Sequence, residues 1–220
     1  MKIDRVNMGL GLALAGLSGA AWRWLTPNRA MGLAEVEARM DHLTRTLPVD
    51  EPDKSMFIER LRVFAAGDDG KPVYMVNLMR YFDEVRKIRG IPEDYRGTAE
   101  EANAHYEKKV MPIAIKLGAQ PLFAGPAAGP NVMAATAEVD GWNRIILMRY
   151  PSRRSFIALL SDAEYQRYLP YKLASLELAL IPANAEMLVP DFRVAAIGGA
   201  AMTLGAAALM RKHGQNGEEG

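Results

Sequence analysis

Residues 73–81 read Val-Tyr-Met-Val-Asn-Leu-Met-Arg-Tyr and residues 144–150 read Arg-Ile-Ile-Leu-Met-Arg-Tyr, and these two stretches decide the fold. Both end in the same tetrapeptide, Leu-Met-Arg-Tyr, and in both the apolar residues occupy both sets of alternating positions. A run of this kind is typical of a strand that is covered on both faces. Because a helical pattern and then a short strand pattern follow each stretch, the sequence predicts two β-α-β units.

The segments between the strands carry helix signals. Thr98 and Glu101 form a capping box at the start of one helix, and Gly118 is expected to end it. Ser152 is expected to open another helix, and residues 185–189 are expected to form the last strand. Two β-α-β units in one sheet predict an α+β fold class, a ferredoxin-like split β-α-β sandwich with its helices on one face of the sheet. A second copy of the sheet is then the simplest cover for the other face.

Two apolar runs without any charged residue, 6–22 and 194–210, lie near the ends of the chain. Each is about 17 residues long, at the short end of what spans a bilayer core. Trp22 and Trp24 bracket Arg23, as expected of an aromatic belt with a snorkelling cation at a membrane interface. The runs therefore predict an apolar membrane helix at the N-terminal end and another at the C-terminal end.

Each run has an alternative interpretation. Lys2 and Arg5 precede the first run and residues 18–20 read Ser-Gly-Ala, so this run also fits a cleaved signal peptide. The second run also fits a small-residue helix that is buried in protein. Positive charges are almost balanced between the two sides, but a signal peptide or a signal anchor would export the central domain. We expect a membrane protein, in the bacterial inner membrane, whose domain faces the periplasm.

These features divide the chain into five segments. We expect an N-terminal membrane helix or signal anchor over 1–25, an amphipathic connector helix over 26–51, a ferredoxin-like α+β domain over 52–190, a C-terminal membrane helix over 191–212 and a polar tail over 213–220. The connector has an apolar stripe at alternating three- and four-residue steps, formed by Leu33, Val36, Met40, Leu43 and Leu47. This stripe predicts a helix that lies against the domain or against the membrane surface.

Composition excludes several kinds of function. The formal net charge is +1 and no basic stripe is interleaved with aromatic residues, so nucleic acid is not an expected partner. The absence of cysteine removes disulfides, thiolate nucleophiles and cysteine metal sites. The three histidines, His42, His105 and His213, are far apart, and no metal-ligand cluster or Ser-His-Asp order is present. We expect no metal and no other cofactor.

Three stretches carry a family resemblance. Residues 64–78 read Phe-Ala-Ala-Gly-Asp-Asp-Gly-Lys-Pro-Val-Tyr-Met-Val-Asn-Leu, residues 149–156 read Arg-Tyr-Pro-Ser-Arg-Arg-Ser-Phe, and residues 162–166 read Asp-Ala-Glu-Tyr-Gln. They resemble the domain-of-unknown-function 1330 family, which is similar to the dimeric α/β-barrel superfamily, and the resemblance covers roughly residues 57–189. It implies a homodimer whose two sheets face each other as a barrel, with clefts between sheet and helices.

The resemblance transfers no catalytic residue. Relatives in the wider superfamily include cofactor-free monooxygenases, lactone isomerases and haem enzymes, and a shared fold does not fix a function. Candidate binding residues are therefore taken from the chain itself.

The first candidate is an anion site formed by Arg149, Ser152, Arg153 and Arg154. Arg153 and Arg154 fall in the first turn of a predicted helix, where the macrodipole disfavours cations. Free backbone amides, serine hydroxyls and guanidinium groups would together bind a carboxylate or phosphate there. The alternative is that both arginines are solvated or are paired with carboxylates of the domain.

The second candidate is a cleft with apolar walls and a few polar groups. Its predicted ligand-binding residues are Asn77, Arg80, Tyr81, Tyr106, Trp142 and Tyr150. The alternative is that these side chains serve core and interface packing. Two functions remain open: a homodimer that binds or transforms a small anionic or aromatic molecule without a metal, or a non-catalytic module for oligomerisation or scaffolding at the membrane.

Overall fold

The structure is a computed structural model that describes residues 28–50, 52–133, 136 and 140–186, together with Gly16 and Gly205. The chain divides into two compact units, Met1–Asn184 and Ala185–Gly220. Every helix and strand described below belongs to the first unit.

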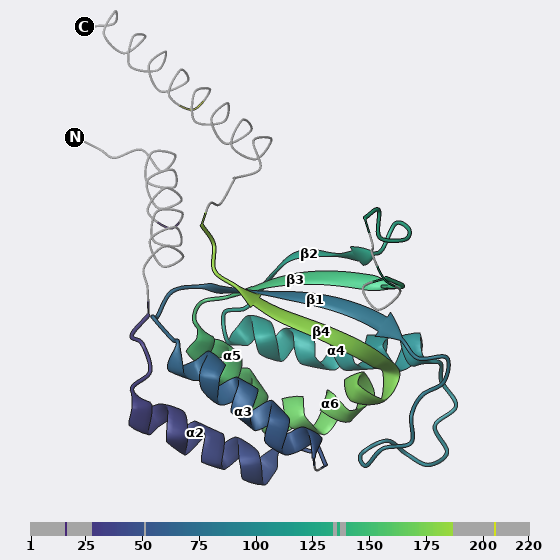
Figure 1. Cartoon of the computed structure of the whole chain (residues 1–220), viewed down its shortest axis with the longest axis horizontal. Helices are drawn as coiled ribbons and strands as arrows, with labels where there is room; N and C mark the ends of the chain where they lie inside the picture. Colours follow the sequence, from purple (N-terminus) through teal and green to yellow (C-terminus); the bar gives the residue numbers. More distant parts are fainter. Residues whose placement is uncertain are drawn as a thin grey trace, which may run out of the picture. The chain divides into compact units, whose positions relative to one another are not determined.

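The described residues form five helices and four strands (Figure 1). In chain order these are α2 (Leu33–Thr46), α3 (Asp53–Ala66), β1 (Val73–Tyr81), α4 (Ala99–Lys116), β2 (Gln120–Pro126), β3 (Arg144–Tyr150), α5 (Arg153–Leu160), α6 (Ala163–Ser175) and β4 (Leu176–Ala183).

The strands form one sheet in the order β2-β3-β1-β4, and every neighbouring pair is antiparallel. α4 connects β1 to β2, and α5 with α6 connects β3 to β4. Each connected pair of strands is therefore separated by one strand of the other pair, which is a split β-α-β arrangement. The predicted α+β class is confirmed at this level.

The helices lie on one face of the sheet (Figure 1). Burial along β1 alternates accordingly: Met75, Asn77 and Met79 are buried, whereas Val76 and Leu78 are only half-buried. Within the described residues, the apolar positions of the second face are thus left without a covering helix, although the sequence pattern predicted cover on both faces.

Local capping signals fix several helix starts. At α4 the backbone N–H of Glu101 donates to the Thr98 hydroxyl (3.1 Å), and the backbone N–H of Thr98 donates to the Glu101 carboxylate (2.8 Å), so the predicted capping box is confirmed. Ser152 caps α5 with its side chain alone, and its hydroxyl accepts from the Ser155 N–H at 3.3 Å. The last strand was predicted wrongly, because β4 begins at Leu176 and pairs with β1 nine residues before the expected position.

Helix α2 lies within the segment 26–51, where the sequence predicted an amphipathic connector helix, and it packs against α3. Val36, Met40, Leu43 and Leu47 of the apolar stripe are buried, whereas Leu33, the first helical residue, is 77% exposed. The stripe therefore stabilises contact with the domain, one of the two roles expected for it.

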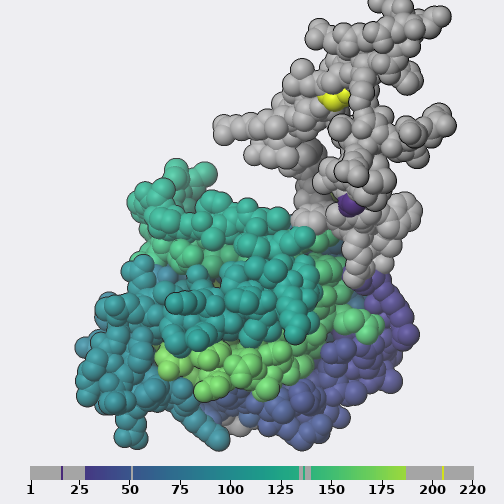
Figure 2. Space-filling view, turned by 180° about the vertical axis from the view of Figure 1, so that it is seen from behind, coloured from purple at the N-terminus to yellow at the C-terminus, as the bar shows by residue number. Residues whose placement is uncertain are grey.

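The loop between β2 and β3 carries two adjacent, exposed apolar side chains, Val132 (97%) and Met133 (91%). In the space-filling view of Figure 2, the teal segment after β2 stands out from the body of the molecule.

The predicted fold class needs a correction, because it included a membrane helix at each end. Among the residues that the structure describes, no helix is both long enough and apolar enough to cross a bilayer. The two runs behind that prediction, 6–22 and 194–210, lie outside the described residues except for Gly16 and Gly205. Membrane localisation stays a prediction from sequence.

Candidate functional site

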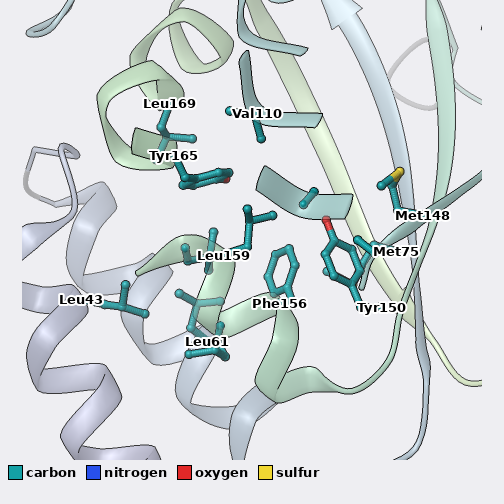
Figure 3. Packing of buried hydrophobic residues seen from close by; sticks show 14 of the residues in the cluster. Leu43, Leu61, Met75, Val110, Met148, Tyr150, Phe156, Leu159, Tyr165 and Leu169 are labelled. Atoms are coloured by element: carbon teal, nitrogen blue, oxygen red, sulfur yellow. The ribbon is translucent and has the colours of Figure 1, made fainter. Parts of the chain in front are cut away.

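A cavity of about 930 Å³ lies between the sheet and the helices, and we call it the sheet–helix cavity. All four helices from α3 to α6 contribute to its lining, and so do the helix-facing sides of β1, β3 and β4. Figure 3 shows the layers: Met75 and Met148 come from the sheet, and Phe156, Tyr165 and Leu169 come from the helices opposite. The cavity also reaches exposed residues, among them Asp53 and Arg89, so it opens to the surface of the domain.

Aromatic rings form much of the wall. The Phe156 ring lies edge-on to Tyr150 (centroids 5.2 Å apart) and to Phe64 (5.6 Å). Tyr106 and Tyr165 make a further edge-on pair at 6.1 Å. Such walls suit an apolar or aromatic guest, because ring edges and faces pack favourably against other rings.

One cation is buried in this apolar surrounding. Lys172 on α6 lines the cavity and is 9% exposed. Its Nζ donates to Asn77 Oδ1 at 3.3 Å and lies 5.2 Å from the centre of the Tyr106 ring. Burial lowers the pKa of Lys172 from 10.5 to about 8, although the charge of Glu107 acts in the opposite direction.

The amide of Asn77 is held in place by the sheet. Its Nδ2 donates to the backbone carbonyls of Met75 (3.1 Å) and Ile146 (3.4 Å), which leaves Oδ1 directed to Lys172. Glu107 is held by Arg144 (Nε 3.2 Å, guanidinium NH2 3.0 Å) and by Asn103 Nδ2 (2.8 Å). The lysine thus meets a neutral amide at hydrogen-bond distance, while the neighbouring carboxylate is committed to other partners.

The tyrosines of the cavity are kept protonated. Burial raises the pKa of Tyr165 to about 12, partly opposed by its hydrogen bond with Tyr106. Burial also raises the pKa of Tyr106 well above its ordinary value, and that of Tyr150 is raised for the same reason. At neutral pH the Tyr150 hydroxyl can donate a hydrogen bond to a guest, and so can whichever of Tyr106 and Tyr165 does not donate to the other.

The structure brings together three of the six residues predicted for the cleft. Asn77, Tyr106 and Tyr150 line the sheet–helix cavity. The other three, Arg80, Tyr81 and Trp142, do not line it.

These three residues make contacts elsewhere on the domain. Arg80 lies over the Trp142 ring, 4.7 Å from its centre, and forms an ion pair with Glu177 (2.9 Å). The Tyr81 hydroxyl lies 3.5 Å from Asn103 Nδ2.

The four residues predicted as an anion site have partners within the domain. Arg153 donates to the Phe64 carbonyl at 2.8 Å, and Arg149 donates to Gln120 Oε1 at 3.3 Å. Arg154 pairs with Glu35 on α2, and Ser152 serves as the helix cap. These contacts match the alternative of pairing within the domain, so the anion site stays a prediction that the geometry does not favour.

Sequence reasoning missed Lys172, which is the most unusual group of the cavity. A signal was present: Tyr165, Leu169 and Lys172 follow one another at steps of four and three, so the lysine occupies a core-facing position of α6. Over the described ranges, no group of three or more histidine, aspartate or glutamate residues is placed to hold a metal ion.

Two solved structures resemble this chain. The crystal structure of methylated RPA0582 protein has 25% sequence identity and a TM-score of 0.51, over 66% of this chain and 98% of that chain. The crystal structure of the RPA0582 protein, of unknown function, from Rhodopseudomonas palustris has 21% identity and a TM-score of 0.49 over the same shares. The first similarity supports the α+β fold and assigns no activity.

No protein-family model and no curated protein matches the chain. The resemblance to the domain-of-unknown-function 1330 family stays a prediction.

Proposed function

We propose that the chain binds a small molecule with an apolar or aromatic body and one oxygen-bearing head group in the sheet–helix cavity. The observation that carries the proposal is Lys172, a buried amine that lines a largely apolar cavity. The volume of about 930 Å³ falls within the range of small-molecule sites, which is about 300–1,000 Å³.

The head group is assigned to Lys172 because burial has removed most of the water from its amine. A buried ammonium group is costly unless it is paired and hydrogen-bonded. Asn77 Oδ1 supplies one acceptor, and an oxygen of the guest would supply a second. The aromatic body would lie against the rings of Tyr106, Tyr150 and Phe156.

Binding is tested with benzoate, benzamide and benzyl alcohol, by thermal shift and titration calorimetry on the full chain. We expect each compound that enters the cavity to raise the melting temperature of the chain. Thermal shift and calorimetry should give the same Kd for that compound. In Lys172→Met the affinity for benzoate should fall by roughly 10- to 100-fold, the loss of one charge-assisted hydrogen bond. The matched control, Lys108→Met, replaces an exposed lysine on α4 and should bind like wild type.

If none of the three compounds stabilises the chain, the proposed binding function is wrong. If they bind equally to wild type and Lys172→Met, the lysine is not the head-group contact.

A second candidate function, oligomerisation, is favoured by the sheet face that the helices leave open. Val76 lies opposite Leu147 on β3 and Ile181 on β4, and Phe123 on β2 lies opposite Leu147. This row crosses all four strands, and Phe123 and Ile181 are about half exposed (53% and 49%). A second copy of the chain would cover the row with an identical row, as in an isologous dimer.

The dimer is tested by sedimentation velocity with Val76→Lys. A lysine in the middle of the row should convert a dimer to a monomer at micromolar concentration, because it would bury an unpaired cation. Val63→Lys is the control, since Val63 is an exposed residue on α3 on the helix side. A wild-type chain that sediments as a monomer, or a Val76→Lys variant that remains a dimer, would exclude this interface.

A further inference from the structure

We propose that Lys172 reacts covalently with carbonyl compounds, its amine forming an imine with an aldehyde or ketone carbon of the molecule in the sheet–helix cavity. This inference rests on the binding function proposed above and narrows the head group of the guest from an oxygen-bearing group to a carbonyl.

The first reason is that the surroundings of Lys172 favour the neutral amine. Its hydrogen-bond acceptor is the uncharged amide of Asn77, and the carboxylate of Glu107 is held by Arg144 and Asn103. With its pKa lowered to about 8, roughly a quarter of Lys172 is neutral near pH 7.5, against about one part in a thousand for an exposed lysine. Desolvation in an apolar pocket is a known route to a nucleophilic lysine.

The second reason is the orientation of the neighbouring amide. Asn77 is held by the backbone carbonyls of Met75 and Ile146, so its Oδ1 accepts one hydrogen of the amine. This contact leaves the nitrogen lone pair available for a carbon that approaches from the cavity.

The other charged groups of the cavity lining do not remove the effect that favours the neutral amine of Lys172. The cavity lining also includes Asp50, Asp53, Arg60, Arg86, Arg89 and Glu177. All six are exposed residues, so solvent screens their charges, and three are acidic and three basic. Glu107 is the half-buried carboxylate that acts on Lys172, and its effect favours the charged amine.

The reaction balances without any further reagent. The amine lone pair forms the C–N bond, the carbonyl π pair moves to oxygen, and one proton passes from nitrogen to oxygen to give a carbinolamine. The hydroxyl then takes up one proton from solvent and leaves as water while the nitrogen lone pair forms the C=N bond, which gives the protonated imine. Tyr106 and Tyr165 both line the cavity and hydrogen-bond each other, so one of their two hydroxyl protons remains to be donated to the carbonyl oxygen.

The test uses the full chain, benzaldehyde as the probe and sodium cyanoborohydride, which reduces the imine to a stable secondary amine. Peptide mapping by mass spectrometry locates the added benzyl group over time near pH 7.5. We expect Lys172 to be labelled at least about 10-fold faster than the exposed Lys108, because its neutral fraction is larger. Benzyl alcohol, which cannot form an imine, should slow labelling at Lys172 and leave labelling at Lys108 unchanged.

Lys172→Arg gives a second readout, because it keeps a cation at the position and should lose the fast-labelled site. Mapping of the wild-type chain decides the question even if the variant does not fold. Labelling of Lys172 no faster than Lys108, in a chain that benzyl alcohol or benzoate still stabilises, would overturn this proposal and leave the binding function standing. Absence of both fast labelling and stabilisation by any of the compounds would overturn both proposals.

Discussion

Replacing Lys172 with methionine should change how the free energy of unfolding depends on pH. Methionine is an unbranched side chain of similar length, so Lys172→Met removes the ammonium group and keeps most of the apolar stem that packs in the cavity. The variant therefore isolates the electrostatic contribution of the buried amine.

The magnitude follows from the pKa of Lys172. Its folded-state value of about 8 lies below the ordinary value of 10.5, so between these two pH values the unfolded chain binds more protons than the folded chain. Stability must then rise with pH in this window, by up to about 1.4 kcal/mol per pH unit. The whole step corresponds to roughly 3 kcal/mol, and the corresponding cost is fully present below pH 8.

Lys172→Met should lack this rise. Near pH 7 the variant escapes the cost of the buried charge, but it leaves Asn77 Oδ1 without its donor, which costs about 1–3 kcal/mol. The two effects partly cancel, so the stability at one pH is a poor test and the slope is the informative quantity. The buried tyrosines have raised pKa values and lower the stability only above about pH 10.

The assay is urea unfolding of the full chain, followed by circular dichroism between about pH 7 and about pH 9.5. Wild type and Lys108→Met should gain stability across this range relative to Lys172→Met, by about 2 kcal/mol in total. Parallel curves for wild type and Lys172→Met would refute the reasoning, since they would mean that Lys172 titrates alike in the folded and unfolded chain.

Two further predictions concern the frame of the site. Leu43→Ala, at a fully buried position of α2, should lower the free energy of unfolding by about 2–5 kcal/mol, whereas Leu33→Ala, at the exposed end of the same stripe, should change it by less than about 0.5 kcal/mol. Equal losses in urea unfolding would show that α2 is not docked as described. Ser152→Ala removes the cap of α5 and should cost about 1 kcal/mol, measured in the same way, and an unchanged midpoint would contradict the capping role.

The parts of the fold that the sequence predicts well depend on local signals. β1 and β3 have the bounds expected from their apolar runs, and the capping box at Thr98 is formed within four residues of chain. The repeated tetrapeptide marks two strands that pair with each other, since Leu78 lies opposite Ile145 in the register. Each of these signals is complete within a short segment, so it can be interpreted without the rest of the chain.

The parts that failed depend on contacts between distant segments. The anion site was predicted from two cations at a helix start, but Arg154 meets Glu35, which lies 119 residues earlier in the chain. β4 was misplaced because residues 171–180 have helical spacing, and pairing with β1 overrides that preference from Leu176 onwards. Periodicity cannot reveal such partners, because it describes one segment at a time.

The sheet–helix cavity depends both on local sequence patterns and on a contact between distant segments. Asn77 interrupts the apolar run of β1 and Lys172 interrupts the apolar face of α6. Taken alone, each is a polar residue at a position where the pattern predicts an apolar one. Their meeting at 3.3 Å, across 95 residues of sequence, makes each the partner of the other. Two apolar side chains would be less costly to bury than this pair. Departures from local rules are expected where a chain trades stability for function, and here two of them meet in the lining of the sheet–helix cavity.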